Sequence, residues 1–186
     1  MNVVWRIENG PALIEPVVHK DDRGYFFESF KEEEFNNKVA NVKFVQDNQS
    51  KSEYGILRGM HCQKGEYAQA KLVRVVQGAV VDVIVDARKD SENYGKVYYA
   101  YLSEENHRQL FVPRGFLHGF LTLRDDTIFQ YKCDNVYNKD SEASARWDSI
   151  DFDWEQYINL NDIKLSYKDT FAPYFDKTKN FKTYYF

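Results

Sequence analysis

The sequence predicts an all-β domain in which about ten short strands form a sandwich or a barrel. Two observations carry this prediction. Apolar runs of strand length recur along the chain between turn residues, and aromatic residues reach 17%, with 14 Tyr and 14 Phe, which suit pleated, half-buried surfaces. Repeats, low-complexity tracts and Gly/Ser-rich linkers are absent from the 186 residues. We therefore expect one continuous domain, residues 1–186.

The expected elements follow from these runs in order. Residues 31–35 are rich in glutamate and predict a short helix, and the last forty residues predict loops and short helices packed on a sheet. The expected strands are 12–18, 25–30, 42–46, 55–61, 71–76, 79–85, 97–102, 109–112, 116–123 and 127–133.

A two-residue turn, Gln77-Gly78, separates two of these strands and indicates a β-hairpin. Pairing about this turn would place Val73 opposite Asp82, and would bring Lys71 within about 7–8 Å of that aspartate at Cβ. Neither face of such a hairpin is cleanly polar. The pattern therefore favours a sheet covered on both sides, or a barrel whose interior holds a ligand.

The strand at 55–61 carries polar side chains inside an apolar run. Arg58 and His61 would point to opposite faces of a regular strand, but Gly59 between them is typical of a β-bulge, which would bring both to one face. With Lys71 and Asp82 they would form a basic lumen suited to an anionic ligand, in which His61 could move a proton. A buried core histidine and a structural ion pair are the alternatives.

A second histidine follows a tight turn in Pro113-Arg-Gly-Phe-Leu-His118, which is the second half of the cupin signature. The first half normally supplies His-x-His and a glutamate, whereas this chain has His61-Cys-Gln63. A metal-dependent cupin is thus an alternative that would need Gln63, Glu66 or His118 as ligands. We expect no metal.

Two further groups have both structural and catalytic interpretations. Tyr131 could be a core tyrosine or an acid that faces the histidine across the lumen. Ser166 and Asp169 could begin a helix, or Asp169 could orient and charge His61 as a His/Asp dyad does.

Composition excludes several classes of function. The formal net charge is −4 and the charges are mixed along the chain, so we expect no nucleic-acid partner. No basic segment precedes a long apolar run, and we expect a cytoplasmic protein without a membrane partner. Cys62 and Cys133 lack the spacing of a zinc or redox pair, so we expect reduced thiols, with Cys62 pointing away from the lumen.

Eight motifs together resemble one family, the dTDP-4-dehydrorhamnose 3,5-epimerases of deoxysugar biosynthesis. Any one of them is weak evidence, but they follow the family's order through nearly the whole chain. The motifs are DRGYFFE (22–28), VQDN (45–48), GILRGMH (55–61), AKLVRV (70–75), VDVIVDAR (81–88), VPRGFLHGF (112–120), YKC (131–133) and SYKD (166–169).

The resemblance implies a double-stranded β-helix, a cupin-like jelly-roll barrel with short peripheral helices. It also implies an N-terminal arm, about 1–50, that contributes to a homodimer, and a C-terminal loop and helix segment, about 148–186. The implied reaction is epimerisation at C3 and C5 of a nucleotide-linked 4-keto-6-deoxy sugar, most simply dTDP-4-dehydro-6-deoxy-D-glucose, without metal or organic cofactor. Related enzymes that invert only C3 or only C5, or that isomerise the ketone, stay open.

The resemblance further implies a role for each matching residue. His61 would be the base and Asp169 its dyad partner, Lys71 would stabilise the enolate oxygen, and Tyr131 would supply a proton from the opposite face. The implied substrate-binding residues are Arg23, Glu28, Gln46, Asp47, Asn48, Arg58, Asp82, His118, Glu142 and Lys168, of which Arg23 and Glu28 would reach the neighbouring subunit's site.

Overall fold

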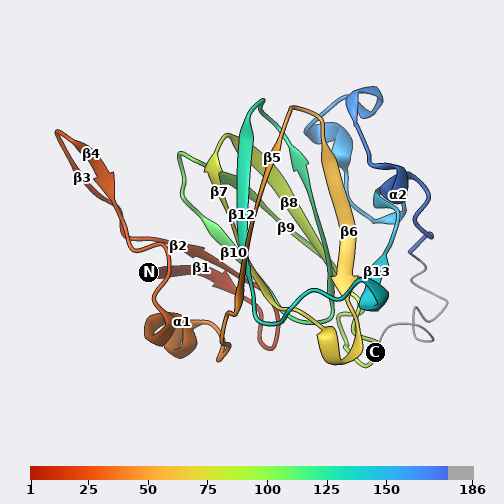
Figure 1. Ribbon diagram of the computed structural model, residues 1–186, viewed down its shortest axis with the longest axis horizontal. Coiled ribbons are helices and arrows are strands. Elements are labelled where there is room, and N and C mark those ends of the chain that lie inside the picture. The colour runs from red at the N-terminus through yellow and green to blue at the C-terminus, as the bar shows by residue number, and fades with distance from the viewer. Residues whose placement is uncertain (176–186) are drawn as a thin grey trace.

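The computed structural model describes residues 1–175. Two antiparallel sheets that face each other make up the body of the molecule (Figure 1). This is the predicted all-β jelly-roll barrel. The six-stranded sheet contains, in spatial order, β1 (Asn2–Arg6), β2 (Ala12–Glu15), β10 (Gln109–Val112), β7 (Lys71–Gln77), β12 (Thr127–Cys133) and β5 (Gln46–Ser52). The five-stranded sheet contains β13 (Glu142–Ser144), β6 (Leu57–Gln63), β11 (Phe116–Thr122), β8 (Ala79–Asp86) and β9 (Val97–Ser103).

Short elements cover the outer faces of both sheets. Helix α1 (Glu32–Lys38) packs Phe35 edge-on against Phe111 of the six-stranded sheet. The C-terminal segment, which includes α2 (Tyr167–Thr170), packs Trp154 and Ile158 on the five-stranded sheet. Between residues 1 and 175, no helix is long and apolar enough to span a bilayer. The remaining short turns are 3-10 helices at Gly65–Tyr67, Lys139–Ser141, Trp147–Ser149, Trp154–Gln156 and Leu160–Asp162.

A separate two-stranded hairpin, β3 (His19–Asp21) and β4 (Gly24–Phe26), projects away from the barrel (Figure 1). The expected strand at 25–30 is thus shorter than predicted and belongs to neither large sheet. The expected strand at 42–46 is also displaced, because β5 begins only at Gln46. Strand β1 was not predicted.

The prediction of a hairpin at Gln77-Gly78 is wrong. Strand β7 pairs with β10 and β12, whereas β8 pairs with β9 and β11, so the turn carries the chain from one sheet to the other. Asp82 accordingly lies beside Phe120 and Ala100, not opposite Val73. Glycine fits this crossing, since a Cβ at Gly78 would lie 2.2 Å from Oγ1 of Thr127.

Apolar side chains that alternate along these two strands meet across the barrel. Val73 and Val75 of β7 pack in the interior against Val80 and Ile84 of β8, and all four are buried. Alternation along each strand therefore identified the inward-facing side chains, although the strands pair with other partners.

The predicted bulge at Gly59 is confirmed. His61 pairs with His118 and Arg58 pairs with Phe120, so two residues of β6 lie opposite Gly119 alone. Gly59 has a φ of +129°, which only glycine adopts readily. The extra residue turns both Arg58 and His61 toward the barrel interior.

Candidate functional site

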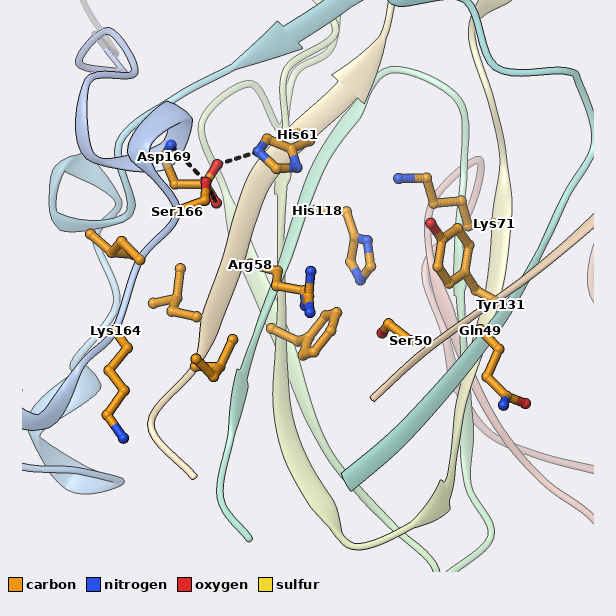
Figure 2. Close-up of a pocket in the computed structure, with 14 residues that line it drawn as sticks. Gln49, Ser50, Arg58, His61, Lys71, His118, Tyr131, Lys164, Ser166 and Asp169 are labelled. Carbon is orange, nitrogen blue, oxygen red and sulfur yellow. Dashed lines mark hydrogen bonds and ion pairs between the residues drawn. The ribbon is translucent and has the colours of Figure 1, made fainter. Parts of the chain in front are cut away.

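A cavity of about 490 Å³ opens between the two sheets (Figure 2). Strands of both sheets and the segment before α2 supply its walls. Its lining residues are Gln49, Ser50, Ile56, Leu57, Arg58, His61, Lys71, His118, Phe120, Tyr131, Lys164, Leu165, Ser166 and Asp169.

The His61 imidazole is bound to a carboxylate from α2. Its Nε2 lies 2.5 Å from Oδ1 of Asp169, while the Ser166 hydroxyl donates a hydrogen bond of 2.8 Å to the other carboxylate oxygen. Burial alone would raise the pKa of Asp169, but the hydrogen bond and charge of His61, with the Ser166 hydroxyl, hold this pKa below its usual value. Asp169 therefore stays ionised and can orient the imidazole and stabilise its protonated form.

The opposite wall carries a phenol and an ammonium. Tyr131 on β12 and Lys71 on β7 come from neighbouring strands, and the Lys71 Nζ lies 5.7 Å from the centre of the tyrosine ring. Figure 2 shows both across the cavity from His61. Burial is the main cause that raises the pKa of Tyr131, so the phenol keeps its proton at neutral pH and can donate it.

Arg58 and His118 lie between these two walls (Figure 2). The Arg58 Nε donates a hydrogen bond of 3.1 Å to the Ser52 hydroxyl, and no carboxylate of residues 1–175 pairs with the guanidinium. His118 binds Asp82 instead, with Nε2 2.9 Å from Oδ2. Asp82 was predicted to contact the ligand, but it is fully buried and does not line the cavity.

Other residues that the sequence singled out lie near the cavity without lining it. Gln46 and Asn48 on β5 bind each other, and the Asn48 amide also contacts the Cys133 sulfur. Asp47 pairs instead with Lys132 at 2.7 Å, away from these two. Glu142 accepts a hydrogen bond from the Tyr137 hydroxyl and forms an ion pair with Lys168, which follows the first residue of α2.

Two predicted residues are not among those that line this chain's cavity. Arg23 stands on the projecting β3–β4 hairpin, where its guanidinium pairs with Asp21 at 2.5 Å (Figure 1). Glu28 follows β4 and is exposed.

Known proteins share both the sequence and the fold of this chain. A family model described as dTDP-4-dehydrorhamnose 3,5-epimerase matches residues 7–177. This chain belongs to that family. The enzyme of that name from Escherichia coli is 46% identical over 86% of this chain and 88% of its own length.

Solved structures of the epimerase family agree in fold. The dTDP-4-dehydrorhamnose 3,5-epimerase of Elizabethkingia anophelis is 48% identical, covers 97% of this chain and 98% of its own, and superposes with a TM-score of 0.88. The dTDP-6-deoxy-D-glucose-3,5-epimerase of Legionella pneumophila, solved with dTDP-4-keto-L-rhamnose, is 37% identical over 93% of this chain and 92% of its own, with a TM-score of 0.86.

The metal-dependent alternative finds little support in the side chains of this epimerase-family barrel. The Gln63 side-chain oxygen accepts a hydrogen bond of 2.9 Å from the Asn138 backbone. His61 and His118 each bind a separate carboxylate, and within residues 1–175 no three His, Cys, Asp or Glu side chains come together as a metal site would require. Cys62 points away from the cavity into the apolar layer behind β6, where burial raises the pKa of its thiol to about 12.

Several lining residues were not predicted from the sequence. Gln49 and Ser50 lie on β5, a strand too polar to stand out by hydrophobic alternation, and its inner face is polar because it borders a cavity. Lys164 was also missed. Its backbone is held beside the start of β6 by hydrogen bonds with Gly55 and Leu57, a long-range pairing that local sequence does not indicate.

Proposed function

We propose that the cavity epimerises dTDP-4-dehydro-6-deoxy-D-glucose at C3 and C5, which gives dTDP-4-dehydro-L-rhamnose. One observation carries the proposal: a carboxylate-bound imidazole and a protonated phenol face each other across a single cavity, with an ammonium beside the phenol. Inversion of a carbon next to a ketone requires a base on one face and an acid on the other. The two sheets supply one each.

His61 is the proposed base. It removes the proton from C3 or C5, and Asp169 stabilises the imidazolium that forms. The proton leaves as the electron pair of the C–H bond moves toward the C4 carbonyl, so negative charge develops on the ketone oxygen. Ser166 holds the second oxygen of Asp169, which keeps the carboxylate aimed at the imidazole.

Lys71 and Tyr131 complete the step. The Lys71 ammonium has no carboxylate partner within residues 1–175, so its charge is free to stabilise the enolate oxygen. Tyr131 then delivers a proton to the carbon from the face opposite His61. The proposed step therefore inverts the centre without any change in oxidation state, and proton exchange with water returns His61 to the neutral base and Tyr131 to the phenol.

Arg58 and His118 form the proposed binding surface for the anionic nucleotide and its sugar. The Arg58 guanidinium, which has no carboxylate partner within residues 1–175, suits a diphosphate. The ligand in the Legionella pneumophila structure, dTDP-4-keto-L-rhamnose, supports this substrate class. We assign supporting contacts at the mouth to Gln46, Asp47, Asn48, Glu142 and Lys168.

The projecting hairpin supports a proposed homodimer. Arg23 and Glu28 do not line the cavity of their own chain, and we infer that they reach the cavity of a partner subunit. Sedimentation of the purified protein tests this assembly: a dimer that becomes monomeric when residues 19–26 are deleted supports it, and a monomeric wild type contradicts it.

Turnover in deuterated water tests the reaction itself. With dTDP-4-dehydro-6-deoxy-D-glucose as substrate, proton NMR should show loss of the C3 and C5 signals, and His61→Asn should abolish both losses. Loss of one signal alone would identify an enzyme that inverts a single centre. No exchange at either carbon would refute the proposal.

A further inference from the structure

The pair formed by Asp82 and His118 is the part of this site that the mechanism has not used. Asp82 lies in the middle of β8, flanked by Val81 and Val83, and is fully buried. One carboxylate oxygen binds the His118 Nε2 at 2.9 Å, while the other, Oδ1, has no hydrogen-bond partner within residues 1–175. His118 is only 7% exposed and forms part of the cavity wall.

Stability does not account for a carboxylate in this place. An incompletely hydrogen-bonded charge in a fully buried place is unfavourable, and apolar replacement of such buried ionic groups is often neutral or stabilising. Burial raises the pKa of Asp82, although the charges of His118 and Lys71 oppose this effect. Residues that break the packing rules of a core in this way are commonly functional.

The group that Asp82 binds is a ring on the cavity wall. When a carboxylate binds Nε2 of an imidazole, it holds the proton on that nitrogen and fixes the ring plane. Nδ1 is then left with a lone pair, at the ring edge not bound to Asp82. His118 is paired across the strands with His61, the proposed base, and both residues line the cavity.

We propose that Asp82 is a positioning residue, which fixes the tautomer and orientation of His118 so that its Nδ1 accepts a hydrogen bond from a hydroxyl group of the bound sugar. The identification of the donor as a sugar hydroxyl depends on the proposed function, whereas the fixed tautomer of His118 does not. Asp82 itself touches no substrate. Its effect passes through the ring that it holds.

Asp82→Asn tests this role, because the amide has nearly the same shape but can also donate to Nε2 and so release the tautomer. We expect kcat/KM to fall about 10- to 100-fold, the range found when a hydrogen-bonded partner behind a functional histidine is lost. The fall should reside mainly in KM, since the contact exists before and during reaction. Binding of dTDP alone, which has no sugar at the reacting position, should stay within about twofold of wild type.

Two controls separate positioning from folding. The melting temperature of Asp82→Asn should equal or exceed that of wild type. If the asparagine variant does not fold, Asp82→Ser replaces it and is expected to raise KM in the same way. In a His118→Phe background, Asp82→Asn should change kcat/KM by less than about twofold, because its effect requires the imidazole.

A spectroscopic measurement is independent of turnover. In ¹⁵N-labelled protein the His118 ring should show a protonated Nε2, and this signature should change in Asp82→Asn. A wild type without epimerase activity would refute the proposed function but leave this spectrum to decide the tautomer. Unchanged kinetics and an unchanged spectrum in Asp82→Asn, additive effects with His118→Phe, or parallel losses of stability and dTDP affinity would overturn the role assigned to Asp82.

Discussion

Alanine at position 59 should separate the two strands that carry both histidines of the cavity. A Cβ on Gly59 would lie 2.4 Å from the Gly119 Cα and 2.9 Å from the His118 carbonyl oxygen, and these backbone atoms cannot rotate away. The φ of +129° adds strain of about 1–3 kcal/mol. Overpacking of a close contact costs about 1–3 kcal/mol more. Gly59→Ala should therefore lower the free energy of unfolding by about 2–6 kcal/mol.

Gly24→Ala is the matched control, because Gly24 has a φ of +127° but no atom lies within 4 Å of the position that its Cβ would take. This variant should lose only the strain contribution. Urea unfolding followed by fluorescence measures both. Gly59→Ala should also lower kcat by about 100-fold, since a shift near 1 Å at reacting groups has that effect. Equal losses of stability in the two variants would refute the close approach of β6 and β11 as the reason for glycine at 59.

Two further substitutions test the proposed chemistry. Lys71→Met should lower kcat by about 100- to 1000-fold with a small change in KM, since it removes charge stabilisation of the enolate. The control is Lys132→Met, on the adjacent strand and paired with Asp47, which should leave kcat within about twofold. Similar losses of kcat in both variants would contradict the role of Lys71. Asp169→Asn should lower kcat by about 100- to 10,000-fold. Because the pKa of Asp169 is lowered in the fold, its stabilising effect is complete above its usual pKa and is lost as pH falls through the lowered value, so the stability difference between wild type and Asp169→Asn in urea titrations should shrink below about pH 4. A difference that grows on acidification would contradict the dyad.

Much of the barrel could be predicted because its strands bury one or both faces. The alternation in β7 and β8 identified the inward valines, and Gly59 correctly indicated the bulge that joins Arg58 to His61. The pairing of the strands was harder to predict from the sequence. A two-residue turn such as Gln77-Gly78 is compatible with a hairpin or with a crossing between sheets, and contacts far along the chain decide between them.

In the functional site, too, some features could be predicted from the sequence and others could not. His61, Lys71 and Tyr131 were expected in one lumen, and they line one cavity. Gln49 on β5 was missed because a strand beside a polar cavity lacks the hydrophobic pattern by which strands are recognised. Asp82 was predicted to contact the ligand, yet His118 of the neighbouring strand β11 lies between it and the cavity, because the pairing of β8 with β11 could not be predicted from local sequence.

The central claim is that base and acid act from opposite walls, and Tyr131→Phe in deuterated water tests it most directly. With the phenol removed, His61 should still take protons and return deuterium to the same face. We predict deuterium at C3 and C5 of recovered substrate with little inverted product. Inversion at the wild-type rate would contradict the account. So would a variant that has lost both deuterium exchange and inversion.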